Sequence, residues 1–189
     1  MQEKEADPQF GAYGFLTLVD PEASITEAVG AYREMVGVTF ANAFVGGSFD
    51  GFVAVKFDSF EEIQTFIIGS DPPSGVETGW SVLVQAALII MAPHKKFPWP
   101  FAHRYESITR IRTGPRQASS VLEAIDSTYA AKLSDHFVAR AAIVTGRKVD
   151  ILVELVATSI ETLQDSIVND LAIIEGIDAS DTSFAFIEE

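Results

Sequence analysis

The chain has 189 residues, of which 48% are hydrophobic, and its formal net charge is −14. The hydrophobic content supports a folded core and excludes a largely disordered chain, and the acidic balance disfavours direct nucleic-acid binding. The sequence contains no cysteine, which excludes disulfides, thiol nucleophiles and cysteine metal sites. With no signal-peptide pattern at the start and no apolar run longer than Val82–Ala92, we expect a cytoplasmic protein without a membrane partner.

The first half reads as strand, helix, strand, strand, helix, strand. Helix starts are indicated by two capping boxes, Ser24 with Glu27 and Ser59 with Glu62. A glycine turn, Gly46–Phe49, separates the second strand from the third. The four predicted strands are Tyr13–Val19, Val38–Val45, Phe52–Phe57 and a strand that begins at Gly79.

The second half repeats this order. Apolar residues at helical spacing predict one helix from Ala118 to Tyr129 and another from Ile160 to Ile174, ended by Gly176. The predicted strands are Ser107–Arg112, Phe137–Val144, Ile151–Val156 and Thr182–Ile187.

An internal repeat underlies this order. Asp50–Ile67 and Asp150–Ile167 align without a gap, and the paired identities include Ser59 with Ser159. The fold class is therefore α+β, with tandem ferredoxin-like βαββαβ units. We place the domains at residues 11–90 and 105–189. The Pro-rich and aromatic linker 91–104 is either a stiff connector or a basic docking segment.

The helix-free face of each sheet is also expected to be covered. Strands such as Phe52–Val55 and Ile151–Val153 are apolar on both sides, which is unusual for a sheet with one face in water. We therefore predict dimeric α/β-barrel-like sheet packing, within the chain or across subunits. A ligand would lie between such sheets.

Charged residues interrupt this apolar face. If Val153 and Leu155 face the helices, then Glu154 faces away from them. Arg110 and Arg112 share one face of their strand, and Arg140 is expected on the neighbouring strand. These residues either form salt bridges with one another or bind the carboxylate of a ligand.

Two sets of motifs resemble the ligand-binding and oligomerisation domain of the Lrp/AsnC family of regulators. The first copy has Gly47-x-x-Asp50, then Ser59-x-Glu61, then Ser74-Gly75-Val76, and the second has Gly146-x-x-x-Asp150, then Ser159-x-Glu161. The resemblance implies a non-catalytic, oligomeric transcription regulator that binds an amino acid or small carboxylic acid. Its helix-turn-helix would be missing, because about a dozen residues precede the first strand. The ligand residues implied by position are Gly46, Gly47, Ser48, Asp50, Gly146, Arg147 and Asp150.

Catalytic and metal-binding motifs are not recognisable in the sequence. The histidines, His94, His103 and His136, have no metal-ligand spacing, and no serine stands in a GxSxG motif. Asp50 and Asp150 are either paired acids or turn-capping residues. We therefore expect no catalytic residue, no metal, no cofactor and no direct nucleic-acid contact, in a homo-oligomer. The alternatives are an ACT-type regulatory domain and a small cofactor-independent monooxygenase or isomerase of the dimeric α/β-barrel fold.

Overall fold

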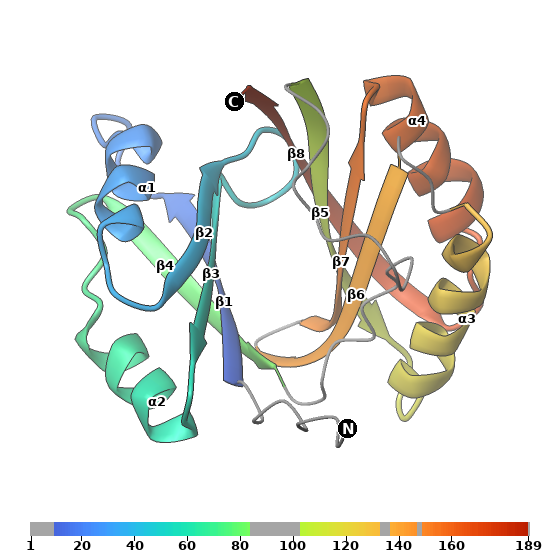
Figure 1. Ribbon diagram of the computed structural model, residues 1–189, viewed down its shortest axis with the longest axis horizontal. Coiled ribbons are helices and arrows are strands. Elements are labelled where there is room, and N and C mark those ends of the chain that lie inside the picture. Colours follow the sequence, from blue (N-terminus) through green and yellow to red (C-terminus); the bar gives the residue numbers. More distant parts are fainter. Residues whose placement is uncertain (1–9, 84–102, 133–136, 147–148, 189) are drawn as a thin grey trace, which may run out of the picture. The chain divides into compact units, whose positions relative to one another are not determined.

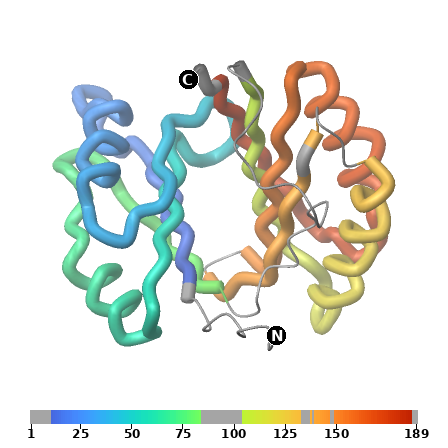
Figure 2. The backbone as a smooth tube through the Cα atoms, in the orientation of Figure 1, coloured from blue at the N-terminus to red at the C-terminus, as the bar shows by residue number. Residues whose placement is uncertain are grey.

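The computed structural model describes residues 10–83, 103–132, 137–146 and 149–188. Contacts within the chain divide it into two compact units. Among the described residues, one unit is formed by 10–44 and 49–83, and the other by 45–48, 103–132, 137–146 and 149–188. Each unit is an antiparallel sheet with helices on one of its faces (Figure 1; Figure 2).

The first unit has the order strand, helix, strand, strand, helix, strand. Its strands pair in the order β2-β3-β1-β4, and its two helices pack on the same face of the sheet (Figure 1). Its elements are β1 (Phe10–Leu18), α1 (Ile25–Arg33), β2 (Val38–Ala43), β3 (Gly51–Phe57), α2 (Phe60–Gly69) and β4 (Val76–Leu83).

The second unit repeats this order, and its strands pair in the order β6-β7-β5-β8. Val45 adds a single bridge to Phe184 of β8. The elements are β5 (His103–Thr113), α3 (Ala118–Ala130), β6 (Phe137–Gly146), β7 (Val149–Ala157), α4 (Ile160–Asp165), a π-helical segment (Ser166–Leu171) and β8 (Ile177–Glu188).

Strand alternation builds the two cores. In the first unit Leu16 and Val53 are fully buried and share a cluster with Tyr32 of α1. In the second unit Val153 lies in the matching cluster with Ile125 of α3. Burying one large apolar side chain contributes about 1.5–3 kcal/mol, so these clusters hold the helices to their sheets.

Helix starts follow the predicted caps. The Ser59 hydroxyl accepts a hydrogen bond from the Glu62 N–H, and the Glu62 carboxylate accepts one from the Ser59 N–H, which completes a capping box. Ser24 caps α1 by accepting a hydrogen bond from the Glu27 N–H, without the reciprocal bond. Unpaired N–H groups at the start of a helix are satisfied in this way.

The last helix departs from the prediction. A regular helical face was expected from Ile160 to Ile174, but the chain changes to π-helical geometry at Ser166. There the Ala172 N–H donates to the Ile167 carbonyl, five residues back, at 2.9 Å. The Tyr129 hydroxyl donates to the Ser166 carbonyl, also at 2.9 Å. This tertiary bond satisfies a carbonyl that regular helical bonding would otherwise use.

The predicted α+β class with two βαββαβ units is confirmed. Strands β5 and β8 are longer than predicted, since they pair from His103 with Glu188 to Thr113 with Ile177. Backbone pairing holds the strand ends in place, and the alternation of polar and apolar side chains does not reveal it. The domain boundaries at 11–90 and 105–189 stay a prediction. Most of the linker 91–104 lies outside the described residues.

Candidate active site

The helix-free face of the second unit's sheet carries charged side chains in a row along β5. Ile111 and Tyr105 belong to the cluster that packs under the helices. Because side chains alternate along a strand, the even-numbered residues of β5 point the other way. These residues are Arg104, Glu106, Ile108, Arg110 and Arg112. The prediction that Arg110 and Arg112 share a face is therefore confirmed. The expectation that Arg140 lies on the neighbouring strand is wrong, because β7 pairs with both β5 and β6 and lies between them.

Glu154 of β7 lies on the same face. Val153 and Leu155 are fully buried in the cluster with the helices, so Glu154 points away from them, as the sequence predicted. Arg140 is its direct cross-strand partner, with Arg140 Nη1 3.3 Å from Glu154 Oε2 and 3.4 Å from Oε1. These distances are long for a charge-assisted bond, which is usually about 2.7–2.9 Å, so this ion pair is loose.

Glu106 is the most unusual group on this face. Its exposed fraction is only 3%, although glutamate is almost never fully buried unless it is paired. Burial raises the pKa of Glu106 well above its ordinary value, and the negative charge of Glu154 adds to this effect. The positive charges of Arg104 and Arg140 act in the opposite direction and are outweighed. A buried carboxyl of this kind keeps its proton well above the pH at which an exposed glutamate loses it.

The register brings the two carboxyl groups close together. Glu106 pairs with Val156, and Glu154 pairs with Ile108, two residues further along β5. Diagonal positions of this kind are about 7–8 Å apart between Cα atoms, within reach of two long side chains. The negative charge of Glu154 next to a buried carboxyl group favours the protonated form of Glu106, so Glu106 is suited to hold a proton and to release it to a substrate.

Glu106 and Arg104 were missed from the sequence. Both lie on the face that contains Arg110 and Arg112, at the same two-residue spacing. Counting back from Arg110 by twos would have found them. The spacing does not show that Glu106 is buried, and burial is what raises its pKa.

The turn at residues 46–48 forms a second polar cluster in the same unit. The Ser48 N–H and hydroxyl donate to Asp181 Oδ2, at 3.3 and 2.8 Å. Arg110 Nη2 donates to the same oxygen at 2.7 Å and also to the Ser48 hydroxyl. The Gly46 carbonyl accepts a hydrogen bond from the Ser183 hydroxyl at 2.6 Å. The carboxylate next to Arg110 is therefore that of Asp181, where the sequence suggested the carboxylate of a ligand.

Burial alone would raise the pKa of Asp181. The bonds from Arg110 and Ser48 outweigh burial, so the pKa of Asp181 lies below its usual value. The geometry of this cluster is that of an internal salt bridge, which orders the turn on β8.

Asp50 and Asp150 have the same role in the two units. Asp50 Oδ2 accepts a hydrogen bond from the Leu18 N–H at 2.9 Å, and Asp150 Oδ2 accepts one from the Thr113 N–H at 2.8 Å. Each aspartate thus satisfies the last backbone donor of a neighbouring strand. This arrangement is the turn-capping alternative, and it gives neither residue a catalytic partner.

Three other predicted binding residues are exposed. Arg112 and Gly146 lie on strands, and Gly47 lies in the 46–48 turn with φ of +67°. Arg147 lies outside the described residues. Whether any predicted residue binds a ligand stays a prediction.

The described part of the chain gives no sign of a metal centre or a membrane span. No three His, Cys, Asp or Glu residues within it are grouped so that they could hold a metal ion. None of its helices has the length and hydropathy needed to cross a bilayer.

Solved structures share this fold over nearly the whole chain. A variant of chlorite dismutase from Candidatus Nitrospira defluvii has a TM-score of 0.58 at 11% identity, covering 96% of this chain and 92% of its own. A protein described as anthrone oxidase-like has a TM-score of 0.59 at 12% identity, covering 97% of this chain and 94% of its own. No protein-family model matches the sequence, and no curated protein does. At such low identity the likeness shows the fold alone, and this fold is the dimeric α/β-barrel type predicted from the sequence.

The resemblance to the Lrp/AsnC family is wrong. The similar structures are a chlorite dismutase and an anthrone oxidase-like protein, and this finding also overturns the prediction of a non-catalytic transcription regulator. The physical reason lies in the motif residues themselves. Asp50 and Ser59 cap a strand and a helix, and Gly46 and Gly47 have positive φ in the turn. These roles belong to strand, turn and helix geometry, so the motifs report the fold and not a family.

Proposed function

We propose that the chain is a small enzyme of the dimeric α/β-barrel fold in which Glu106 transfers a proton to and from an organic substrate. This is the monooxygenase or isomerase alternative raised by the sequence. The observation that supports it is a carboxyl group that is 3% exposed, next to Glu154, with a raised pKa. Acid–base catalysis is most efficient when the pKa of the catalytic group lies near the working pH, and burial moves a carboxyl group in that direction.

The charges around Glu106 favour proton abstraction from a neutral substrate. With both carboxylates ionised, Glu106 and Glu154 balance the two arginines, Arg104 and Arg140, and the cluster is neutral. When Glu106 accepts a proton, the cluster has a net charge of +1 and the substrate has −1. Positive charge aimed at the site where negative charge develops stabilises the transition state. The cluster is therefore suited to forming an enolate or phenolate.

The surroundings favour a largely apolar substrate. Ile108, Leu152 and Val156 lie on the same sheet face as Glu106, and each has an exposed fraction of 5% or less. The anthrone oxidase-like neighbour suggests a concrete candidate. Anthrone has an acidic C–H opposite its carbonyl, and loss of this proton gives an anion that reacts with O₂. The balanced reaction converts anthrone and O₂ into anthraquinone and water.

An anthrone oxidation assay tests the proposal. The wild type should accelerate formation of anthraquinone, followed by absorbance. Replacement of Glu106 with Gln, which has nearly the same shape, should lower kcat by about 10²–10⁴-fold, the usual contribution of a general acid or base. The matched control is Glu123→Gln, because Glu123 is exposed on α3, and this variant should keep full activity.

A second measurement covers other substrates. Hydrogen–deuterium exchange at acidic C–H positions, followed by NMR for a panel of cyclic ketones, detects proton abstraction without oxidation. Exchange or oxidation that is as fast in Glu106→Gln as in the wild type contradicts the assignment of Glu106. If the wild type accelerates neither reaction for any compound, the proposal of a proton-transferring enzyme is wrong.

The remaining predictions from the sequence fit this proposal. We propose that the enzyme is a cytoplasmic homo-oligomer that acts without nucleic acid or a membrane. Its acidic composition supports the absence of nucleic-acid binding, and its lack of cysteine supports a cytoplasmic location.

A further inference from the structure

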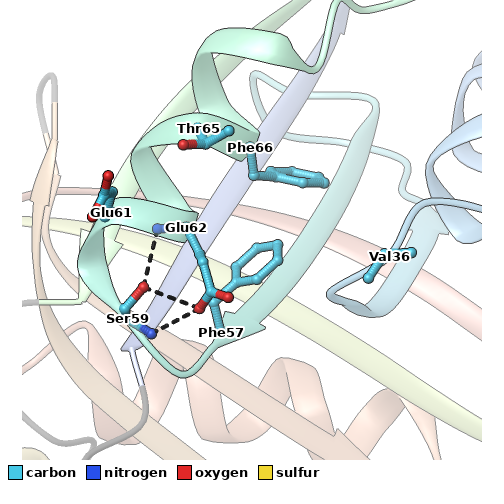
Figure 3. A pocket seen from close by; sticks show the side chains of 7 residues that line it. All are labelled: Val36, Phe57, Ser59, Glu61, Glu62, Thr65 and Phe66. Atoms are coloured by element: carbon cyan, nitrogen blue, oxygen red, sulfur yellow. Dashed lines mark hydrogen bonds between the residues drawn. The ribbon is translucent and has the colours of Figure 1, made fainter.

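The first unit has a groove, with a volume of about 610 Å³, beside the end of β3 and the first turns of α2 (Figure 3). Two aromatic rings lie in it, Phe57 and Phe66, with centroids 5.4 Å apart and planes tilted by 48°. Val36, which is 88% exposed, lies across the groove from them (Figure 3). The two rings are half-buried, and with the exposed Val36 they give the hollow an apolar lining of the kind that ligand sites have.

A carboxylate is fixed at the same place. Glu62 Oε2 accepts hydrogen bonds from the Ser59 N–H and from the Ser59 hydroxyl, each at 3.0 Å (Figure 3). These bonds hold the Glu62 side chain beside the Phe57 ring, so little rotational freedom remains to be lost on binding. Glu61 also lines the groove, and the described lining residues include no lysine or arginine.

The second copy of the repeat lacks this combination. In the ungapped alignment Phe57, Glu62 and Phe66 correspond to Ala157, Thr162 and Ser166. There Ser159 still caps its helix, by accepting a hydrogen bond from the Thr162 N–H at 3.2 Å. A βαββαβ unit therefore does not need the two rings or the glutamate at these positions. In the first unit Phe57 and Phe66 are half-buried and pack against the core, so part of each ring serves the fold and the part that lines the groove is open to a ligand.

We propose that this groove binds a small organic cation that carries a quaternary ammonium group. Aromatic rings attract such cations through the negative potential of their faces, and a nearby carboxylate adds direct attraction. The start of α2 contributes a partial positive charge of about one half, which opposes a cation, but Glu61 and Glu62 outweigh it. A neutral ligand of the same shape would gain the apolar contact with Val36 and lose both electrostatic contributions.

Choline and its neutral isostere 3,3-dimethylbutan-1-ol test this proposal on the full chain. Isothermal titration and thermal-shift measurements should show saturable binding of choline and much weaker binding of the alcohol. Replacement of Glu62 with Gln keeps the capping box, since Gln also serves at this position, and removes the charge. This variant should bind choline about twofold to fivefold more weakly, as expected for a partly exposed charge pair. Phe66→Leu should weaken binding by a similar factor of about twofold to fivefold.

Glu161→Gln is the control, because Glu161 is exposed at the start of α4 in the other copy and this variant should bind choline normally. Circular dichroism and the Tm of each variant show whether it is folded. Equal affinity for choline and the alcohol, unchanged affinity in both groove variants, or no saturable choline binding by the wild type would each overturn the proposal. None of these measurements depends on enzyme activity.

Discussion

Replacing Glu106 with Gln should change how the stability of the protein depends on pH. The pKa of Glu106 is raised in the folded chain, so the folded state holds this proton over a pH range in which the unfolded chain has released it. Stability therefore falls as the pH rises from the ordinary value near 4.5 to the pKa in the folded protein, and then levels off. Gln cannot ionise, so this fall is absent in the variant.

The size of the effect follows from the same linkage. Each unit by which the pKa of Glu106 is raised removes about 1.4 kcal/mol from the free energy of unfolding at higher pH. Because Glu106 is 3% exposed, water screens this effect little. We expect Glu106→Gln to match the wild type near pH 4 and to exceed its stability at pH 8.

Urea unfolding at a series of pH values measures this difference, with Glu123→Gln as the control that should follow the wild type throughout. Parallel stability curves for the wild type and Glu106→Gln between pH 4 and 9 would show that Glu106 ionises normally. That result would refute the reasoning behind the candidate active site, whatever the substrate.

Two further predictions concern hydrogen bonds made by aspartates. Asp150→Ala removes the acceptor for the Thr113 N–H. Urea unfolding should show that the free energy of unfolding falls by about 1.5–3 kcal/mol, the range for a hydrogen bond to a charged group. A fall of less than about 0.5 kcal/mol would contradict the capping role. Asp181→Asn weakens the contacts with Arg110 and Ser48, which are partly exposed, so a loss of at most about 1 kcal/mol is expected at pH 7. Because the pKa of Asp181 is lowered, its contribution to stability is present at neutral pH and is lost in acid. The free energies of unfolding of the wild type and the variant should therefore converge near pH 2. A difference that stays constant with pH would contradict the ion pair.

The fold was predictable because its signals are local and occur twice. These signals are the spacing of apolar residues, the serine at the start of α1, α2 and α4, and the aspartate after the turn in each unit. Each depends only on residues a few positions away in the sequence. Ser59 and Asp50 have the structural roles that their sequence context indicates. The same local character misled the family assignment, because these residues are required by the fold and carry no information about a ligand.

The chemistry was harder to predict because it depends on burial and on neighbours far along the chain. Glu106 and Glu154 are 48 positions apart in the sequence, and only the pairing of β5 with β7 brings them together. Arg110 looked like a candidate for binding a ligand carboxylate, but Asp181, reached through the pairing of β5 with β8, is its partner. Neither pairing register can be worked out from apolar periodicity.

The duplication also bears on how many copies of the candidate active site one chain contains. In β3, Ala54 holds the place of Glu154, and its partner across the ladder is Phe40, where the other copy has Arg140. The pairing of Gly11 with Lys56 likewise places Gly11 where the other copy has Glu106. The two halves have thus diverged on a shared scaffold. A tightly binding substrate analogue should therefore bind with a stoichiometry of one molecule per chain. A dimer of two identical domains, with the same total length as this chain, would bind two molecules.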